Sequence, residues 1–517
     1  DRNTAVGFAA LDALTSGQYN TAVGDNTLSS VSTGDNNTAI GRAALNANTG
    51  DNNTAVGTHA LLENTSGTRN VAVGALAGDA ITTGNDNVAI GGGTDGVSFA
   101  ALTACTTGGT NVAVGTGSLA AITTQGGNTA VGYGAGLNLT TTGVVAIGYQ
   151  ALATSTTGYD TVAIGQSALT ANTTGNENVA VGFNAMLSNT TGSDNVAIGN
   201  GALDSCTTAS NNTVIGRGAG SAIDVGGGNT LIGDSCGDAI NASNGKWNTA
   251  VGWGALGSCG PRFQNTAVGQ GCLSSNDAHG NTGVGAKCLE DNTSGSGLNG
   301  FGYFALNKNT TGDDNNAFGT SAGGNITTGD ENSCFGSNAG GSVTTGSNNL
   351  LLGHDAGVTG SPGGNFTTHS NRVVLGDENI AEFNCQVALS VASDERDKTD
   401  FTALDIGLDF VKSLKPYTYK WDKRSKYVDW ENNPNTDLNT ITHDGTHKEA
   451  QLDIGFKAQD VEKLEKAAGY NRTNKTNLTY ALSGDGKQYS MKYEKLVPIL
   501  VKAIQELEAK VAELESK

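Results

Sequence analysis

The chain has 517 residues, including 76 Gly and only 5 Pro; 15% of its residues are charged, and its formal net charge is −20. This composition is unlike that of several ordinary globular domains, and so acidic a chain excludes the basic groove of a nucleic-acid-binding protein. No apolar run approaches the roughly 18 residues needed to cross a bilayer. We therefore predict a repeat protein with no nucleic-acid partner.

The charge is unevenly distributed along the sequence. Residues 393–517 contain 20 basic and 22 acidic residues, whereas residues 1–392 contain 9 basic and 27 acidic ones. The first part therefore carries −18 and the second −2. Copies of the first part held side by side would need short-range packing to offset their repulsion.

A pentad first seen at Asn3–Gly7 recurs 22 times up to Gly376, almost always in steps of 17 residues. The residue before Gly is always Val, Ile, Leu or Phe, and Asn stands four before Gly in 18 units. Alternation along the pentad predicts a five-residue strand with one bulky and one small face. We expect the bulky position to lie in the core, and a turn such as Asn189–Gly192 to return the chain.

One coil of this size cannot bury its apolar face alone, so residues 1–376 should stack as a parallel β-solenoid with ladders about 4.8 Å apart. The Asn column is then a structural ladder or a turn-forming position. Two longer steps, around Thr94 to Thr106 and Ser361 to Ser370, are predicted to bulge out as loops. We expect local irregularity where the Asn is replaced, at Val144, Thr161, Leu298 and Arg372.

All eight cysteines precede residue 393, and Cys236, Cys272 and Cys288 each stand three residues after a motif Gly, where Ala stands in other units. We interpret them as small buried hydrophobes rather than a disulfide framework. Turns such as Gly34–Asn36 loosely resemble calcium-binding turns but lack the period of calcium-binding repeats. Whether these turns bind cations stays open. The prediction is no metal site and no cofactor.

The pentads resemble the head repeats of trimeric autotransporter adhesins. That resemblance implies a left-handed parallel β-roll that packs as a trimer. The period near 17 residues leaves open whether the second half of each coil is a strand or a helical turn.

After Gly376, residues 377–392 are predicted to form closing strands and a linker, because Ile380–Phe383 and Gln386–Leu389 alternate. Residues 393–517 then read as a small α+β domain. Its expected elements are a helix over 402–414 that ends before Pro416, a strand over 417–421, and a strand leading into a helix over 454–461.

Residues 496–517 are predicted to form a coiled-coil helix, with a/d positions at Val497, Leu500, Ile504, Leu507, Val511 and Leu514. So short a helix should be stable only against partner chains. The pattern by itself favours a two-stranded coil, whereas the repeats favour a trimer.

The junction between the two parts begins at Ser393 and ends at Lys398. Peptide cleavage requires a nucleophile and a base, which a serine and a lysine can supply if the surroundings favour the neutral amine. On spacing alone, a charged linker is the more probable interpretation.

Four ordered motifs extend from this junction into the tail. They are Ser393-Asp394-x-Arg396-x-Lys398, Lys415-Pro416-Tyr417-x-Tyr419-x-Trp421, Gly455-Phe456-x-Ala458-Gln459-Asp460-Val461 and Tyr493-x-x-Leu496. Together they resemble the self-cleaving intramolecular chaperone domain at the C-terminus of phage tail spikes and fibres. Asp460 departs from the Glu usual at that position.

This resemblance implies a domain that trimerises, templates the folding of the upstream β-structure and cuts the chain next to Ser393. It makes Ser393 the nucleophile and Lys398 its base, while Asp394 and Arg396 hold the geometry. Whether the broken bond precedes or follows Ser393 stays open.

We therefore expect a homotrimeric phage tail fibre, made in the host cytoplasm and located in the virion. Its expected partners are a host-cell receptor, glycan among the candidates, and the virion tail or baseplate, bound through a missing N-terminal part. One alternative is the head of a bacterial trimeric surface adhesin, which would place the protein at the cell surface. Another is a depolymerase tailspike, which needs paired carboxylates in an aromatic-lined groove.

Overall fold

The structure, a computed structural model, describes residues 2–30, 33–93, 99–240, 245–260, 262–380, 382–386, 391–428, 436–483 and 486–517. The chain divides into two compact units. One comprises Asp1–Phe304 with Asn309–Thr311, and the other Ala305–Lys308 with Gly312–Lys517. The boundary between them lies inside the repeat array.

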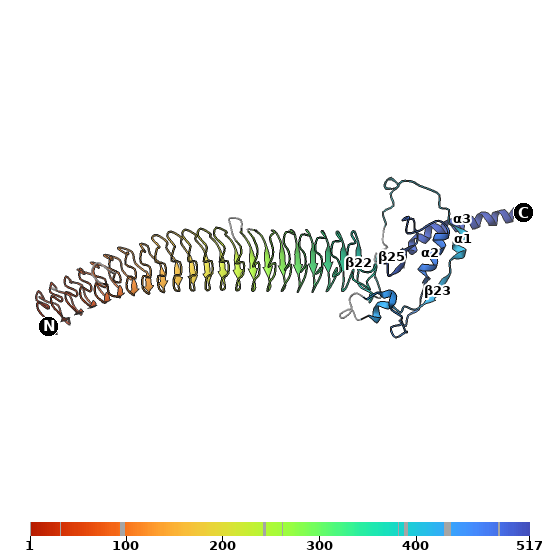
Figure 1. Ribbon diagram of the computed structural model, residues 1–517. Helices are drawn as coiled ribbons and strands as arrows, with labels where there is room; N and C mark the ends of the chain where they lie inside the picture. The colour runs from red at the N-terminus through yellow and green to blue at the C-terminus, as the bar shows by residue number, and fades with distance from the viewer. Residues whose placement is uncertain are drawn as a thin grey trace. The chain divides into compact units, whose positions relative to one another are not determined.

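The first unit is a stack of coils, each of which contributes one short strand to a parallel sheet (Figure 1). Its strands are Thr4–Val6 (β1), Thr21–Val23 (β2), Thr38–Ile40 (β3), Thr54–Val56 (β4), Val71–Val73 (β5), Val88–Ile90 (β6), Val112–Val114 (β7), Thr129–Val131 (β8), Val145–Ile147 (β9), Val162–Ile164 (β10), Val179–Val181 (β11), Val196–Ile198 (β12), Thr213–Ile215 (β13), Thr230–Ile232 (β14), Thr249–Val251 (β15), Thr266–Val268 (β16), Thr282–Val284 (β17) and Asn299–Phe301 (β18). Consecutive strands pair in register, as Ala163 does with Ala180. The predicted parallel β-solenoid of about 17-residue coils is confirmed.

The second unit opens with four strands of the same kind, which also pair in parallel and in register. They are Asn316–Phe318 (β19), Ser333–Phe335 (β20), Leu350–Leu352 (β21) and Val373–Leu375 (β22). In the described part of the chain, no helix combines the length and the apolarity that crossing a membrane requires.

Each array strand has three residues rather than the predicted five. The Asn at the start of the pentad leaves the backbone ladder, because its N–H donates to a side chain: Asn20 N to Asn3 Oδ1, at 2.8 Å. The motif Gly ends the strand at a left-handed φ, such as +138° at Gly7. Only the three residues between these positions remain in the ladder.

The expected core position was wrong, because the two strand faces are reversed. The small central residue is fully buried, as at Ala72 and Ala163, whereas the bulky residue before Gly faces outward, with Ile40 41% exposed and Ile164 36% exposed. Alternation assigns the two residues to opposite faces without saying which is inside. The interior of each coil beside the strand accommodates only a methyl-sized side chain in most units.

The Asn column is a buried structural ladder, as predicted. Asn195 accepts at Oδ1 from both the backbone N and Nδ2 of Asn212, each at 3.1 Å, and its own Nδ2 donates to Ala209 O at 2.8 Å. Replacing the Asn does not disturb the sheet, contrary to expectation: Val144 N still donates to Asn128 Oδ1 at 3.1 Å, and β8 and β9 pair in register. The backbone donor alone therefore keeps such a coil in place.

The second half of each coil consists of turns and contains no strand or regular helix in the described residues. Non-glycine residues with positive φ recur there, such as Ala43 at +54° and the fully buried Leu45 at +50°. Each such residue costs of order 1–3 kcal/mol, so packing and inter-coil hydrogen bonds must hold it. One such bond runs from Leu45 N to Ala60 O, at 3.0 Å.

The core beside these turns is filled in two complementary ways. In nine coils the fourth residue after the motif Gly is Leu and the seventh is small or polar, as in Leu256 with Cys259. In others the fourth residue is Gly, and the seventh is large, as in Gly237 with Ile240. A Cβ on Gly237 would stand 2.9 Å from both Ile240 Cδ1 and Leu231 Cδ1, so in this coil Ile240 and Leu231 occupy the space that a side chain at position 237 would need.

We predict that Gly237→Ala destabilises the array by about 2–4 kcal/mol, from left-handed strain plus overpacking. Gly254→Ala is the matched control, because both glycines have a φ of +61° but a Cβ on Gly254 meets nothing within 4 Å. The control should cost only the strain, about 1 kcal/mol. Urea unfolding followed by circular dichroism measures both variants, and equal losses would contradict the packing explanation.

Seven of the eight cysteines are buried, as predicted, and Cys385 is exposed. Burial raises the pKa of Cys206 and of Cys334 to about 12, so these thiols remain protonated. The side chain of Cys272 packs against Gly283 of the next coil, where a Cβ would stand 2.6 Å from Cys272 Sγ. The cysteines therefore act as core residues.

The insertion over Ser361 to Ser370 does not simply bulge outward. Phe366, 5% exposed, lies in the core, and its N donates to Gly357 O at 2.9 Å. Ser361 Oγ accepts from Gly357 N at 3.0 Å. The insertion thus supplies an aromatic side chain to the last coil. Of the other insertion, residues 94–98 lie outside the described residues.

The predicted closing strands are absent from the described residues of 377–392. Instead the chain turns after β22, because Asp377 accepts from the backbone N and Nδ2 of Asn379, both at 2.9 Å. The predicted alternation over Gln386–Leu389 falls mostly on residues outside those described.

The remaining elements form a small α+β region, as predicted. They are the 3-10 helix Glu395–Asp397 (η1), Leu408–Ser413 (α1), Pro416–Tyr419 (β23), the 3-10 helices Arg424–Tyr427 (η2) and Leu438–Thr440 (η3), Asp453–Phe456 (β24), Ala458–Ala467 (α2), Tyr480–Leu482 (β25), Tyr489–Met491 (β26), the 3-10 helix Tyr493–Lys495 (η4) and Leu496–Glu515 (α3). β23 pairs antiparallel with β24, and β25 with β26. Ile406, Phe410, Leu496 and Ile499 form the core.

The first helix is shorter than the predicted span of 402–414. It starts only at Leu408, whose N donates to Glu506 Oε2 of α3 at 2.7 Å. This side chain from a distant helix supplies the N-terminal acceptor that the local sequence lacks, since the N-cap residue is Gly407.

Candidate functional site

The junction from Ser393 to Lys398 folds into a single turn around η1. Asp394 is the N-cap of η1 and accepts from Arg396 N at 2.9 Å, while Arg396 Nη2 donates to the same carboxylate at 2.5 Å. These hydrogen bonds lower the pKa of Asp394 and keep it ionised. The two residues therefore fix the local backbone, and the supporting role in cleavage stays a prediction.

This turn brings the ends of the hexapeptide together. Lys398 Nζ lies 2.5 Å from Ser393 Oγ and donates a hydrogen bond to it. Six residues of sequence could not show that the lysine reaches the serine. The pair has the geometry of a nucleophile and its base, with the serine hydroxyl next to the group that would take its proton. The catalytic role itself stays a prediction.

Both Ser393 and Lys398 are exposed to solvent in the single chain. A lysine acts as a general base only in its neutral form, which burial favours. Within the described residues, the chain does not itself cover the pair. A buried catalytic site would therefore need a surface from outside the described part of the chain.

The aromatic motif at β23 joins the motif at β24 through one carboxylate. Asp453 Oδ2 accepts from Tyr419 Oη at 3.3 Å and from Trp421 Nε1 at 3.1 Å. Desolvation and the nearby Asp453 charge raise the pKa of Tyr419 to about 12. Tyr419 and Trp421 thus act as hydrogen-bond donors that hold the two strands together.

Position 455, the glycine of the Gly455-Phe456 motif, has no room for a side chain. A Cβ on Gly455 would stand 2.4 Å from Tyr493 Oη and 3.2 Å from the Tyr419 ring. Tyr493 belongs to the fourth motif, and its Oη accepts from Phe456 N at 3.3 Å. Three of the four motifs therefore meet here.

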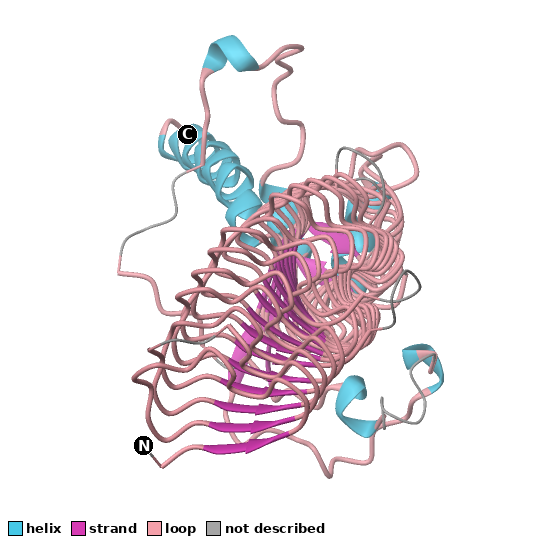
Figure 2. Ribbon diagram, turned by 90° about the vertical axis from the view of Figure 1, so that its left-hand side faces the viewer, coloured by secondary structure: helices cyan, strands magenta, loops and turns pink. Residues whose placement is uncertain are grey.

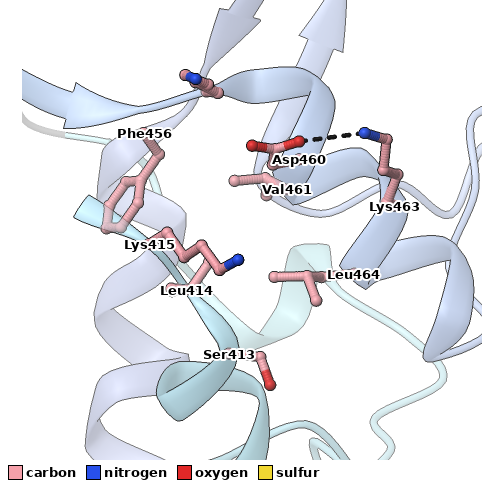
Figure 3. Close-up of a pocket in the computed structure, with 9 residues that line it drawn as sticks. Ser413, Leu414, Lys415, Phe456, Asp460, Val461, Lys463 and Leu464 are labelled. Atoms are coloured by element: carbon pink, nitrogen blue, oxygen red, sulfur yellow. Dashed lines mark hydrogen bonds and ion pairs between the residues drawn. The ribbon is translucent and has the colours of Figure 1, made fainter. Parts of the chain in front are cut away.

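A cavity of about 210 Å³ lies beside this cluster (Figure 3). Leu414, Phe456, Val461 and Leu464 give it apolar walls, while Ser413, Lys415, Lys457, Asp460 and Lys463 are its polar lining residues. The motif residues Lys415 and Asp460, which are far apart in sequence, meet at this cavity. Ser393 and Lys398 do not line it.

The six predicted coiled-coil positions of α3 are all exposed. Their exposed fractions lie between 43% and 70%, at Val497, Leu500, Ile504, Leu507, Val511 and Leu514. The opposite side of the helix is used within the chain, since Leu496, Ile499 and Ala503 are buried. The helix therefore has a second apolar face that no part of the described chain covers.

Two residues that build the domain were not found from sequence. Glu465 is fully buried and accepts from Leu478 N and Thr479 N, each at 2.7 Å. Glu506, 98 positions after Leu408, accepts the hydrogen bond from Leu408 N at the start of α1. Glu465 lies beyond the predicted span of 454–461, because the helix of the structure continues to Ala467.

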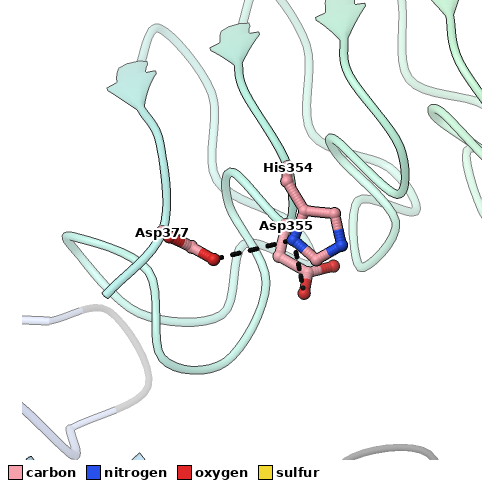
Figure 4. A group of neighbouring side chains, drawn as sticks. All are labelled: His354, Asp355 and Asp377. Carbon is pink, nitrogen blue, oxygen red and sulfur yellow. Dashed lines mark ion pairs between the residues drawn. The ribbon is translucent and has the colours of Figure 1, made fainter. Parts of the chain in front are cut away.

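One group of potential metal ligands lies at the end of the array (Figure 4). His354 Nδ1 lies 3.2 Å from Asp355 Oδ2 and 3.6 Å from Asp377 Oδ2. Burial alone would raise the pKa of Asp377, but hydrogen bonds from Asn379 and His354 outweigh it and lower the pKa. These residues pair with one another, and the arrangement gives no reason to assign a metal.

The described residues thus combine a stacked β-solenoid with a small α+β region in which a Ser/Lys pair lies at the junction. Residues 393–470 match the family described as chaperone of endosialidase, whose domains are known for autoproteolysis. The match begins at Ser393 itself. No match was found among curated proteins or among solved structures. The chain therefore combines a β-solenoid with a C-terminal region that is similar to this chaperone family, an organisation that fits a phage tail fibre or tailspike.

Proposed function

We propose that the C-terminal domain assembles three copies of the chain, directs the folding of their β-solenoids and then cuts each chain next to Ser393. The observation that carries the proposal is the contact between Lys398 Nζ and Ser393 Oγ at the first residue of the family match. Asp394 and Arg396 support it, because they shape the turn that creates the contact.

In the proposed reaction Lys398, as a neutral amine, takes the proton of Ser393 Oγ. The oxygen attacks the carbonyl carbon of the adjacent peptide bond, forming an ester, and the departing amine takes up a proton. Water then hydrolyses the ester. One water is consumed per cut, leaving a carboxyl end on the solenoid part and an amino end on the chaperone part.

Assembly would control this reaction. The exposed seam of α3 supplies the contact between copies, and neighbouring chains would cover the Ser393–Lys398 pair, favouring the neutral lysine. A stack of similar coils can slip by one repeat at little local cost, so a domain that associates first would fix the register. Removing it afterwards would make the assembled fibre kinetically stable.

The assembled product would be a fibre in the virion, attached to the tail or baseplate and directed at a host receptor. Support for this comes from the family of the C-terminal domain and from the β-solenoid before it.

Expression of the full chain and mass spectrometry test the cutting reaction. The wild type should release a fragment of about 125 residues, and the mass should show whether it begins at Ser393 or Asp394. Ser393→Ala and Lys398→Ala should each slow cutting by roughly three orders of magnitude or more.

Thr399→Ala is the matched control, because Thr399 follows Lys398 directly and its hydroxyl donates to Asp400 Oδ2 at 3.2 Å. It should cut like the wild type. Unchanged cutting in both Ser393→Ala and Lys398→Ala would rule out the proposed pair.

A further inference from the structure

The residues that directly follow each motif Gly form a column at the end of the strands. The strands of the first unit line up one above another (Figure 2), so residues at the same position of successive coils are neighbours. Backbone hydrogen bonds fix the register of this column, since the carbonyl of Tyr149 accepts from Ser167 N of the next coil at 2.9 Å. The column is therefore a rigid support for its side chains.

From Tyr133 to Gln270, all nine residues of this column have a planar side-chain group, and we call this stretch the planar stripe. Four of them are aromatic, and the other five are Gln, Asn, Arg or Asp. The coil does not require such residues, because Thr116 and Ala286 occupy the same position in the coils just before and just after the stripe. The run of planar groups therefore has a reason other than the packing of the coils.

The aromatic side chains of the planar stripe are exposed. Trp253 is 60% exposed, Tyr133 56% and Phe183 46%. The rings of Tyr133 and Tyr149 stack on each other, with centroids 5.6 Å apart and an interplanar angle of 13°. Large aromatic groups held in solvent on a rigid support are typical of a binding surface, because covering them with a ligand is favourable.

Open space lies beside the planar stripe. The next residue of the coil is Gly in five of the nine coils. A Cβ on Gly254, beside Trp253, would meet nothing within 4 Å, and a Cβ on Gly134 would meet only Gln150 Cγ, at 3.7 Å. The left-handed backbone does not by itself require these glycines, since His59 occupies the same position of its coil with a φ of +60°. A ligand can therefore approach the aromatic groups from this side.

The side chains of the planar stripe suit a sugar chain. A pyranose ring has a face of polarised C–H groups, which the electron-rich face of an aromatic ring attracts, and hydroxyls that pair with side-chain amides. Gln166 stands between Tyr149 and Phe183 in consecutive coils, so both kinds of contact are available side by side. Eight steps of about 4.8 Å make the stripe roughly 38 Å long, which is enough for several sugar units in a row.

Charge favours a neutral sugar chain. Residues 1–392 carry a net charge of −18, which repels acidic glycans and nucleic acids. The two charged members of the stripe, Arg217 and Asp234, neutralise each other in an ion pair of 2.8 Å. A polymer without charge can therefore approach the stripe without electrostatic cost.

The planar stripe has the groups to bind a glycan but not to hydrolyse one. Glycoside hydrolysis ordinarily uses two carboxyl groups, one of which donates a proton. Asp234 is the only carboxylate among the nine residues of the stripe. The hydrogen bond from Arg217 lowers the pKa of Asp234 and keeps it ionised, so it is unsuited to donate a proton.

We infer that the planar stripe is a binding site for a neutral, linear glycan that lies along the array. It rests on the proposed receptor role, and it specifies the class of receptor and the residues that contact it. Tyr133, Tyr149, Phe183 and Trp253 would stack on sugar rings, while Gln166 would hydrogen-bond to their hydroxyls.

Affinity electrophoresis of the full chain, in gels that each contain one polysaccharide, tests this site. The neutral probes are dextran, amylose, mannan and galactan, and the acidic probes are polygalacturonate and hyaluronan. At least one neutral probe should retard the wild type, and the dependence of mobility on its concentration gives the affinity. Trp253→Ala should weaken that affinity roughly three- to tenfold, and the double variant Tyr133→Ala and Tyr149→Ala should weaken it further.

Trp247→Ala is the matched control, because Trp247 belongs to the same coil as Trp253 and is similarly exposed, at 63%, but precedes the strand β15 instead of following it. It should bind like the wild type. Equal losses in Trp253→Ala and Trp247→Ala would overturn the inference. So would a wild type that no neutral probe retards, or that only the acidic probes retard.

Light scattering and the fraction cut, measured on the same samples, separate this site from the proposed assembly and cutting. A chain that assembles and cuts but binds no neutral glycan would overturn the glycan site alone. A chain that stays uncut but binds a neutral glycan through Trp253 would support the glycan site and contradict the cutting reaction.

Discussion

Replacing two residues of the α3 seam, in the double variant Ile504→Glu and Leu507→Glu, is expected to leave the chain monomeric and uncut. Both side chains are exposed in the single chain, at 65% and 49%, so the variant should fold. In an assembled seam, each pair of facing carboxylates would be buried without a counter-ion, at a cost of about 3–5 kcal/mol. Each such pair weakens association by roughly a hundredfold to several thousandfold.

The matched control is the double variant Gln505→Glu and Ala509→Glu, which adds the same charge on exposed positions outside the seam. It should assemble and cut like the wild type. Light scattering gives the mass of each variant, and electrophoresis gives the fraction cut. Efficient cutting by a monomeric seam variant would contradict control by assembly, and a wild-type dimer would contradict the trimer.

Removing the buried carboxylate, in Glu465→Ala, is expected to destabilise the C-terminal domain by about 3–5 kcal/mol. The carboxylate joins α2 to the segment before β25, and its loss leaves the N–H groups of Leu478 and Thr479 and the Thr479 hydroxyl without their acceptor. Each unsatisfied buried donor costs roughly 1–3 kcal/mol.

Urea unfolding in a Ser393→Ala background, followed by circular dichroism at the helix band, measures this loss, because the described α-helices lie in the C-terminal domain. Glu465→Gln keeps one acceptor oxygen and should lose less. Lys463→Ala, on the exposed side of α2, should change little. An unfolding midpoint of Glu465→Ala equal to that of its parent would show that the carboxylate is not needed.

The sequence by itself determined the features that depend on local period and composition. The 17-residue recurrence predicted stacked coils, the Asn column predicted the ladder through Asn195, and the heptad steps predicted α3. The four motifs predicted the C-terminal domain. Such features are readable because each is repeated, or is set by residues close together in the chain.

Only the tertiary structure decided which strand face is buried. Alternation separates Ala163 from Ile164, but the narrow interior of the coil selects the smaller of the two. The tertiary structure also supplied the hydrogen-bond partners of Leu408 and Glu465, which come from other segments of the chain. Most directly, it showed that Lys398 reaches Ser393, because the turn held by Asp394 and Arg396 is a three-dimensional arrangement that residue spacing does not specify.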